Sequence, residues 1–493
     1  MKTAAVAFIL SMFCGAVLTP IVRLLAYRFG LFDHALSSRK IHGAPIPRLG
    51  GIAIVIAFYA PLIGLKLFQT GIGHLFLGQH AHVVGLFTGG LIIALLGLYD
   101  DLRGSGAGLK FLVQFGVAGF LYYLGFRIDL LANPIGGPIS LGWLSLPFTV
   151  FWIVGVINAL NLIDGLDGLA GGVSLVAVII TFLISVQRGE PLMMLFTAAL
   201  AGSILGFLFY NFNPASIFMG DTGSMFLGFV LATTAIQTNQ KSSTAVAVLI
   251  PAVALGLPIM DTLLAITRRA VRGRPLFQAD REHIHHRLLA IGLSHRQAVL
   301  VLYGLCALLG AAALTLTYTN SSQSALLLIV LALVAFVFLR SLGYVRFDRL
   351  AESTADRKRN KALLASVRPL GRRLRQFQNV DEMWPSVIEA AAAIGATAVS
   401  LRTSSTFETE AAPSSSLSHE FGADNDAAAM FRAQFPVPCG KRRQCQLEFG
   451  WTDGRGEVDR DTEIAIEVFC EYLGNVIESA PSLRVLRGNT SQI

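Results

Sequence analysis

The sequence predicts an all-α polytopic membrane protein with about eleven transmembrane helices, followed by a small cytosolic α/β domain. Three observations support this fold class. Of the 493 residues, 54% are hydrophobic and only 14% are charged, whereas soluble domains carry roughly 25% charged residues. Apolar stretches close to the ~20 residues of a membrane-spanning helix recur along most of the chain. The last part of the chain is polar and long enough for a domain of ~100 residues.

The predicted spans share a run of apolar residues with few or no charges. They are 3–25, 50–68, 83–98, 109–125, 146–160, 170–186, 190–209, 224–238, 244–266, 298–318 and 323–339. The first span is longer than the ~7–15 apolar residues of a signal peptide, so we interpret it as an uncleaved helix.

The loops between the spans predict the orientation, because cytoplasmic loops carry an excess of Lys and Arg. Such loops follow the first and the ninth span, at 26–49 and 267–297. Successive spans cross the membrane in opposite directions. With these two loops in the cytosol, the N-terminus lies outside and the C-terminal tail lies in the cytosol. Three loops with conspicuous aspartates, 99–108, 158–169 and 210–223, then all face the cytosol. The pattern therefore predicts one site on the cytosolic side.

Composition divides the chain into four segments. They are a membrane domain over 1–341, a basic helical linker over 342–380, a cytosolic accessory domain over 381–480 and a flexible tail over 481–493. The linker is expected to form a charged helix that lies along the lipid headgroups.

Periodicity in the accessory domain predicts an α/β fold. We expect helices over 383–394 and 461–477, strands over 396–401 and 444–451, and a Ser/Pro/Ala-rich loop over 411–418. This order is similar to GAF-type domains at the level of pattern. It contains no recognisable catalytic constellation.

Cysteine spacing and net charge argue against two other classes of protein. The five cysteines form no CxxC pair and no metal-binding spacing, so we expect no disulfide framework. The net charge of +8 is explained by basic loops beside the membrane, so we expect no nucleic-acid partner.

The segment 158–169 (Asn-Ala-Leu-Asn-Leu-Ile-Asp-Gly-Leu-Asp-Gly-Leu) directly follows an apolar run. Asn158, Asn161, Asp164 and Asp167 recur at every third residue, which places neighbours on one slowly drifting helix face. Charge at the end of an apolar span is costly unless it is hydrated, paired or metal-bound, so it indicates a functional site. A polar turn between two membrane helices is the alternative.

Asp100 and Asp101 end the third span. Adjacent residues on a helix point about 100° apart, so the two carboxylates are not equivalent. We expect one to face the site and the other to bind a neighbour such as Arg103 or Lys110. A water-exposed acidic pair at a helix end is the alternative.

The segment 218–224 (Phe-Met-Gly-Asp-Thr-Gly-Ser) opens the eighth span. A carboxylate at a helix start with small neighbours, such as Asp221, suits Mg²⁺ and leaves coordination positions for phosphate oxygens. Phe218 is placed in a cytosolic loop, where it can stack on a base. The alternatives are a helix N-cap for Asp221 and an interfacial aromatic anchor for Phe218.

The basic loop after the ninth span contains three histidines among arginines, including Arg281. This composition suits a pyrophosphate group. His283 and His286 share a face if the segment is helical. A zinc site and a basic anchor to anionic lipid are alternatives, and the zinc site has no Cys or fourth ligand at a suitable spacing.

Carboxylates, histidines and cations on one membrane face are the groups that metal-assisted phosphoryl transfer requires. Placement at the membrane surface predicts one lipid substrate and one soluble cytosolic substrate. A cation-coupled secondary transporter is the rival from another class. Transporters place such charges near the midplane and often in repeated halves, whereas these charges lie at the cytosolic ends and no repeat is visible.

Together the motifs resemble the polyprenyl-phosphate N-acetylhexosamine-1-phosphate transferase superfamily, over about residues 1–340. Four motifs occur in the family's order: Asp100-Asp101, 158–169, 218–224 and His283-Ile284-His285-His286. The resemblance implies transfer of an N-acetylhexosamine 1-phosphate, favouring GlcNAc 1-phosphate, from a UDP-sugar to a polyprenyl (undecaprenyl) phosphate, with release of UMP.

The same resemblance implies a cofactor, a location and a pathway. Mg²⁺ is the implied cofactor, with Mn²⁺ as a substitute. The implied location is the bacterial inner (plasma) membrane with the active site facing the cytoplasm, and a homodimer is one arrangement open to it. The product would initiate a cell-envelope polysaccharide, such as a lipopolysaccharide or an O-antigen.

By this resemblance Asp221 is the metal ligand, and the catalytic residues are Asp100, Asp101 and Asp164. The substrate-binding residues are Lys110, Asn158, Asn161, Asp167, Phe218, Arg281, His283, His285 and His286. One member of the Asp100–Asp101 pair acts as a base or positions the lipid phosphate. Asp167 and Phe218 contact uridine, and the histidines bind the diphosphate. The family places a lysine facing the site after the Asp pair, and Lys110 matches it. Gln114 lies one helical turn after Lys110.

The segment 280–286 (Asp-Arg-Glu-His-Ile-His-His) is similar to the branch that uses UDP-GlcNAc or related donors. The branch that transfers phospho-MurNAc-pentapeptide usually has three consecutive histidines, and that activity is the alternative. Direct attack by the lipid phosphate and a covalent aspartyl intermediate are both open. The resemblance does not explain residues 381–493.

Overall fold

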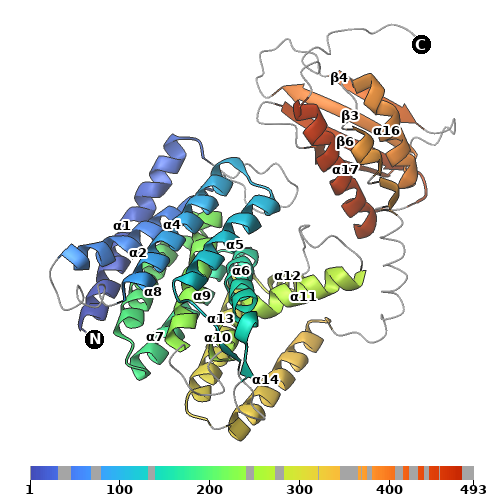
Figure 1. The fold of residues 1–493 in the computed structure, drawn as a ribbon. Coiled ribbons are helices and arrows are strands. Elements are labelled where there is room, and N and C mark those ends of the chain that lie inside the picture. The colour runs from blue at the N-terminus through green and yellow to red at the C-terminus, as the bar shows by residue number, and fades with distance from the viewer. Residues whose placement is uncertain are drawn as a thin grey trace. The chain divides into compact units, whose positions relative to one another are not determined.

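Helices form most of the chain up to residue 341, in the order that the apolar spacing predicts (Figure 1). The computed structural model describes residues 2–31, 46–67, 79–131, 139–239, 249–272, 283–319, 321–344, 363, 365–367, 369–374, 380–405, 415–420, 431–437, 443–454 and 456–479. The chain forms two compact units. One contains the membrane helices, and the other consists mainly of the chain from residue 347 onward and also includes Arg268–Arg272.

Among its described residues, the regular structure of the first unit is helical apart from one short hairpin. Its helices are α1 (Lys2–Arg28), α2 (Gly50–Leu67), α4 (His80–Arg103), α5 (Ala107–Tyr123), α6 (Ser145–Ile163), α7 (Leu169–Gln187), α8 (Pro191–Asn211), α9 (Gly220–Asn239), α10 (Leu249–Ala254), α11 (Gly256–Arg272), α12 (Ile284–Ala290), α13 (His295–Leu316) and α14 (Ser321–Ser341). The hairpin joins β1 (Leu130–Leu131) to β2 (Ile139–Ser140) in antiparallel register. The sequence did not predict this hairpin.

Seven helices of the described residues are long and apolar enough to cross a membrane: α1, α4, α6 with the preceding turn, α7, α8, α13 and α14. Two further apolar helices, in α2 and α5, are shorter. The chain is therefore a mostly helical, multi-pass membrane protein. The number of eleven crossings and the sides of the two termini stay predictions.

The ninth predicted span, 244–266, is not one continuous helix. α10 ends at Ala254 and α11 begins at Gly256. The main cause is Pro258, whose nitrogen has no hydrogen to donate to the carbonyl of Ala254, four residues earlier. The predicted span is therefore divided at Leu255 into α10 and α11, and its part before Leu249 lies outside the described residues.

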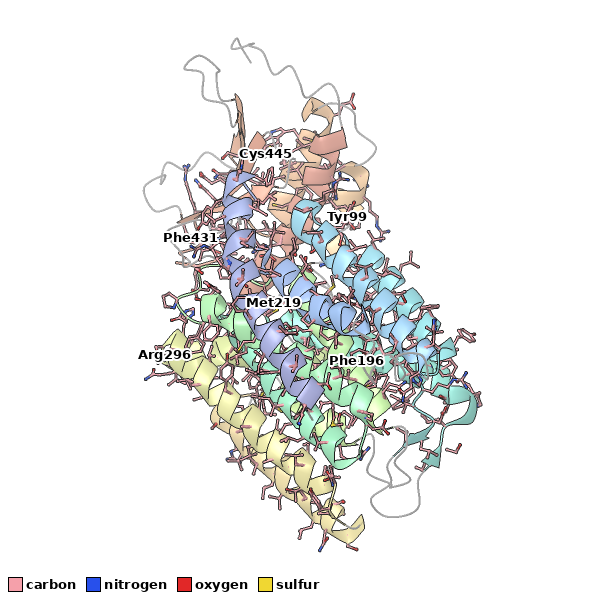
Figure 2. All side chains as sticks on the ribbon, turned by 90° about the vertical axis from the view of Figure 1, so that its left-hand side faces the viewer. Tyr99, Phe196, Met219, Arg296, Phe431 and Cys445 are labelled. Carbon is pink, nitrogen blue, oxygen red and sulfur yellow. The ribbon has the colours of Figure 1, made fainter. Side chains whose placement is uncertain are left out.

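The most buried helix of the unit is α9. Every residue from Thr222 to Thr238 is buried, and α9 packs against α2, α4, α6 and α7. Phe196 of α8 and Met219, just before α9, lie inside the same helix bundle (Figure 2). Because α9 is central, the residues at its first turn are surrounded by other helices.

Glycines allow α1 and α8 to pack closely. A Cβ atom on Gly206 would collide with the carbonyl oxygen of Met12, and one on Gly15 would lie 2.9 Å from the carbonyl oxygen of Ser203. Small residues at such crossings let helix backbones approach within the membrane.

The second unit is an antiparallel sheet with helices. Its strands are β3 (Ala398–Ser405), β4 (Ser415–Glu420), β5 (Phe431–Val437) and β6 (Arg443–Trp451), in the order β4-β3-β6-β5. Its helices are α16 (Val380–Ala393) and α17 (Arg460–Ser479). The predicted helices and the two predicted strands are present.

Two strands of this sheet were missed by the prediction. β4 is Ser-rich and overlaps the predicted loop 411–418, so that loop assignment was wrong from Ser415 onward. β5 contains Pro436, which weakens a strand signal but is tolerated at a sheet edge. Both strands lie at the edges of the sheet. β5 does alternate apolar with other residues, so its pattern was present in the sequence and was overlooked.

Part of the predicted linker helix belongs to the core of this unit. Val367, Leu370 and Leu374 are buried in the same apolar cluster as Leu447 and Phe469. Their apolar face is therefore covered by the α/β unit, which corrects the expectation that it lies on lipid headgroups. The rest of the predicted linker falls largely outside the described residues.

One cysteine differs from the expectation of no disulfide. Cys445, in β6, is disulfide-bonded, whereas Cys14, Cys306 and Cys470 are free. The spacing of single cysteines does not reveal which side chains adjoin across a hairpin, so the sequence could not indicate this bond.

We expect Gly206→Ala to lower the stability of the helix bundle by about 1–3 kcal/mol, because the added methyl group overpacks the α1–α8 contact. Gly155→Ala is the matched control, since a Cβ atom there meets nothing within 4 Å. Thermal unfolding of both variants in detergent measures the effect. Equal melting temperatures for the two variants would contradict the close packing of α1 on α8.

Candidate active site

The two residues just before α9 accept hydrogen bonds from the first turn of α2. Backbone N–H groups of Gly50 and Gly51 donate to the carbonyl oxygens of Phe218 (2.9 Å) and Met219 (2.8 Å). Gly220 has a φ of 71°, which glycine adopts at little cost. A Cβ atom on Gly220 would also lie 2.7 Å from both carboxylate oxygens of Asp101. This turn therefore requires glycine, and it sets the direction of Asp221.

Asp101, at the end of α4, caps the N-terminus of α9. Its Oδ1 accepts from the backbone N–H of Asp221 at 2.8 Å. Its Oδ2 accepts from the N–H of Thr222 at 2.9 Å and from the hydroxyl of Thr222 at 2.6 Å. A carboxylate is stabilised at this end of a helix, where the peptide dipoles point their positive ends. Both oxygens of Asp101 are therefore engaged in holding Asp221 in place.

Asp100 points to Lys110 instead. Its Oδ1 accepts from the backbone N–H of Ser105 at 2.7 Å and from the Ser105 hydroxyl. Its Oδ2 accepts from the Lys110 ammonium at 2.8 Å. The same ammonium donates to Oδ2 of Asp221 at 2.5 Å. Lys110 thus bridges two carboxylates from different helices. The prediction that one member of the Asp100–Asp101 pair binds a neighbour such as Lys110 is confirmed for Asp100, whereas Asp101 binds the start of α9.

Asn161 and Asp164 reach this cluster from the end of α6. The amide of Asn161 donates to Oδ1 of Asp221 and to the hydroxyl of Ser224, both at 3.0 Å. Asp164 is the residue that ends α6. Burial raises the pKa of Asp164 to about 7, and the negative charges of Asp221 and Asp101 act in the same direction. Arg48 opposes them with its positive charge.

Asn158, predicted as a substrate contact, is engaged elsewhere. Its amide donates to the side-chain oxygen of Gln114 at 2.7 Å and to the carbonyl of Val154. Gln114 is fully buried and donates in turn to the sulfur of Met225 at 3.4 Å. These bonds join α6 to α5 and α9 about one helical turn before Asn161. Asn158 therefore helps to hold the helices that carry the cluster.

Asp167 holds the loop before α9. Its Oδ2 accepts from the side-chain amide of Asn213 and from the backbone N–H of Ala215, both at 3.0 Å. The half-buried Phe218 ends this loop, and its backbone N–H donates to the carbonyl of Pro47 at 2.8 Å. Asn211, the last residue of α8, accepts from the N–H of Gly168. The described contacts of Asp167 thus shape the loop that carries Phe218.

The three histidines lie at the start of α12. Nδ1 of His283 is 2.9 Å from Oδ2 of Asp261. The rings of His283 and His285 are stacked, with centroids 5.7 Å apart, and His286 lies 4.2 Å from His285. Burial and the neighbouring His286 lower the pKa of His285 to about 3, so this ring is neutral. Arg281 lies outside the described residues.

The histidines adjoin the turn that carries Asp164. A Cβ atom on Gly165 would lie 2.5 Å from Nε2 of His285. The glycine therefore leaves room for the ring of His285. The structure thus brings together Asp100, Asp101, Lys110, Asn161, Asp164 and Asp221, with the His283–His286 segment alongside Gly165.

Several residues of this arrangement were not predicted. Ser105 and Ser224 have no signal of their own, because short polar residues are common at helix ends. Asp261 did have a signal, since it is a carboxylate within the apolar run 244–266. Arg48 was noted only as a basic loop residue, although its charge acts on Asp164.

The donor set suits a hard divalent cation that shares its ligands with a substrate. The described residues contain no group of three or more His, Cys, Asp or Glu side chains that could hold a metal by themselves. Mg²⁺ is usually held by one or two carboxylates together with substrate phosphates and water. The carboxylates of Asp221 and Asp164 and the amide oxygen of Asn161 fit that pattern, and Lys110 already shows that a positive charge is stable beside Asp221.

Comparison with known proteins identifies the class of protein that this fold and site define. Residues 83–239 match the family model of glycosyl transferase family 4. This stretch contains the Asp100–Asp101 pair, Lys110 and the segments 158–169 and 218–224. The chain belongs to the polyprenyl-phosphate N-acetylhexosamine-1-phosphate transferase superfamily within this glycosyl transferase family.

Three relatives show where the chain falls within that family. It is 38% identical over 299 residues to a probable undecaprenyl-phosphate N-acetylglucosaminyl 1-phosphate transferase of Bacillus subtilis, covering 60% of this chain and 80% of the relative. It is 39% identical to a decaprenyl-phosphate N-acetylglucosaminephosphotransferase of Mycolicibacterium smegmatis, covering 64% and 82%. It is 30% identical to a phospho-N-acetylmuramoyl-pentapeptide-transferase of Listeria welshimeri, covering 62% and 94%.

The raised pKa of Asp164 predicts a pH-dependent stability. The folded protein keeps a proton on Asp164 up to a pH of about 7, whereas the unfolded chain loses it near the ordinary value of 3.8. Between these values the folded state binds more protons, so a rise in pH destabilises it. Asp164→Asn, which is neutral at every pH, is therefore expected to gain stability relative to the wild type as the pH rises from about 4 to about 8.

Thermal unfolding of the wild type and Asp164→Asn across this pH range measures the difference. Asp129→Asn is the control, because Asp129 accepts from Ser145 at the opposite end of α6. Parallel melting curves for the wild type and Asp164→Asn at all pH values would contradict the assignment.

Proposed function

We propose that the protein transfers an N-acetylhexosamine 1-phosphate from a UDP-sugar to a polyprenyl phosphate, giving polyprenyl-diphosphate-HexNAc and UMP. The observation that carries this proposal is the bridge of Lys110 between Asp100 and Asp221, at the end of an apolar helix bundle. It combines carboxylates with a cation at a position that a lipid phosphate and a soluble nucleotide can both reach. Similarity to two GlcNAc-1-phosphate transferases supports it.

In this mechanism an oxygen of the lipid phosphate attacks the β-phosphorus of the UDP-sugar in line. The new bond joins that oxygen to phosphorus, and the bond between the β-phosphorus and the bridging oxygen breaks. UMP leaves with the electron pair of that bond. Phosphoryl transfer of this kind depends mainly on positioning and on charge stabilisation.

We assign the chain's residues to distinct tasks in this reaction. Asp221 would hold Mg²⁺, assisted by Asp164 and Asn161, and the bound ion, or Mn²⁺ in its place, would supply positive charge to the diphosphate. Lys110 supplies a second positive charge for the lipid phosphate. Asp100 orients Lys110 and is the member of the Asp100–Asp101 pair that can face a substrate.

Asp101 is assigned a positioning task, because both of its oxygens bind the first turn of α9. His283, His285 and His286 are assigned to the diphosphate, and Phe218 to the uracil ring. Asp167 is assigned to uridine through the loop that it shapes. Arg281 keeps its assignment to the diphosphate as a prediction from the motif.

The donor and the location follow from the same comparison. A UDP-GlcNAc donor is favoured over UDP-MurNAc-pentapeptide, since identity to the GlcNAc-type relatives is 38–39% against 30% for the pentapeptide transferase. The site is assigned to the cytoplasmic face of a bacterial inner membrane, because UDP-sugars are cytosolic and the adjoining loops are basic. The lipid product would start a cell-envelope polysaccharide.

The test is release of UMP by the detergent-solubilised protein with UDP-GlcNAc, polyprenyl phosphate and Mg²⁺. We expect Asp221→Ala to lower kcat by at least about 100-fold, because charge stabilisation of the diphosphate is lost. The control is Asp129→Asn, an acidic residue outside the cluster, which is expected to retain wild-type turnover.

Two results would contradict the proposal. The first is wild-type turnover by Asp221→Ala. The second is no UMP release by the wild type with any UDP-N-acetylhexosamine, which would favour the transporter alternative.

A further inference from the structure

A buried carboxylate lies in α11, outside the cluster around Asp221. Asp261 is 3% exposed. Its Oδ2 lies 2.9 Å from Nδ1 of His283, and its Oδ1 accepts from the backbone N–H of Ile284 at 2.9 Å. Each oxygen therefore holds one group at the start of α12. An ionised carboxylate at such a position is costly unless it is paired in this way.

The contact with Asp261 selects the state of the His283 ring. A carboxylate is only an acceptor, so Nδ1 of His283 carries a hydrogen whether the ring is neutral or charged. The nitrogen left for another partner is Nε2, and none of the described residues hydrogen-bonds to it. A partner on one ring nitrogen commonly sets the orientation and the tautomer of a functional histidine.

The ring of His283 stacks on the ring of His285, so the orientation of one ring restricts the orientation of the other. The rings of His283 and His285 are parallel to within 4°. His285 is buried, neither of its ring nitrogens has a hydrogen-bond partner within the described structure, and it packs against Gly165 beside Asp164. The arrangement Asp261–His283–His285–Gly165 therefore connects α11 to the turn that carries Asp164.

We propose that Asp261 is a positioning residue that fixes the ring orientation and the tautomer of His283, so that Nε2 of His283 faces the diphosphate of the sugar-nucleotide donor. This inference rests on the proposed function and deepens it. Asp261 touches no substrate and acts through His283. It also caps α12, and the experiment must separate that structural task from the proposed one.

Asp261→Asn separates the two tasks. The amide oxygen still accepts from the N–H of Ile284, so the cap on α12 is retained. The amide nitrogen now faces Nδ1 of His283 and donates to it, so the hydrogen of the neutral ring moves to Nε2. A carboxylate-to-amide change of this kind reverses a histidine tautomer in the serine-protease triad.

The first test reads the tautomer directly and needs no activity. ¹⁵N NMR of histidine-labelled full-length protein at about pH 8, above the ordinary pKa of histidine, is expected to show hydrogen on Nδ1 of His283 in the wild type and on Nε2 in Asp261→Asn. The His283 signal is assigned by its loss in His283→Gln. The same tautomer in the wild type and in Asp261→Asn would overturn the inference, whatever reaction the enzyme performs.

The second test reads the effect on the donor. Asp261→Asn is expected to lower kcat/KM for UDP-GlcNAc by about 10–100-fold, the range for lost partners of functional histidines. KM for polyprenyl phosphate is expected to stay within about twofold. Ser294→Ala is the matched control, because Ser294 caps α13 in the same region and its side chain is hydrogen-bonded to Gln297, not to the His283–His286 segment. This variant is expected to keep wild-type kinetics.

A double-mutant cycle decides whether Asp261 acts through His283. In the His283→Gln background, Asp261→Asn is expected to cost no more than about twofold further. An equal loss in both backgrounds would overturn the proposal, because Asp261 would then act independently of the histidine. If Asp261→Asn fails to fold, Asp261→Glu takes its place. That variant keeps the carboxylate and is expected to retain hydrogen on Nδ1, and hydrogen on Nε2 would overturn the inference.

Discussion

The burial of several carboxylates around the first turn of α9 is the constraint on which the rest of the site depends. An ionised carboxylate in apolar surroundings is costly unless hydrogen bonds or opposite charges compensate it. Asp101 is compensated by the backbone of α9, and Asp100 and Asp221 share the ammonium of Lys110. Asp164 is left with a raised pKa. The cluster is therefore short of positive charge, which suits a site that receives a cation together with phosphate groups.

This cluster forms because helix backbones meet closely at one point. A Cβ atom on Gly51 would collide with Gly223, and one on Gly97 would lie 2.6 Å from the carbonyl oxygen of Asp221. Glycine at these crossings lets α2 and α4 both touch the start of α9. The same closeness brings Asp101 within hydrogen-bond distance of the α9 backbone. Packing and electrostatics thus depend on each other at this turn.

The histidine segment is a second, separately supported part of the site. The matched family region, 83–239, contains the carboxylate cluster but not His283–His286. The segment is held by Asp261 on α11, which is a separate helix only because the ninth apolar run is broken near Pro258. The α/β unit differs again, since it has its own apolar core, which includes the fully buried Trp451 and Phe449. The α/β unit is therefore a separately packed part of the chain.

The sequence by itself determined the helical membrane fold, the approximate helix positions and most of the polar residues that the structure brings together at the candidate site. It did so because apolar runs and isolated charges are local signals. Only the tertiary structure decided which carboxylate does what. Asp100 and Asp101 are adjacent and chemically identical, yet one binds Lys110 and the other caps α9. The same is true of the Ser-rich strand β4 and of the Asp261–His283 contact, which depend on neighbours far along the chain that no local pattern encodes.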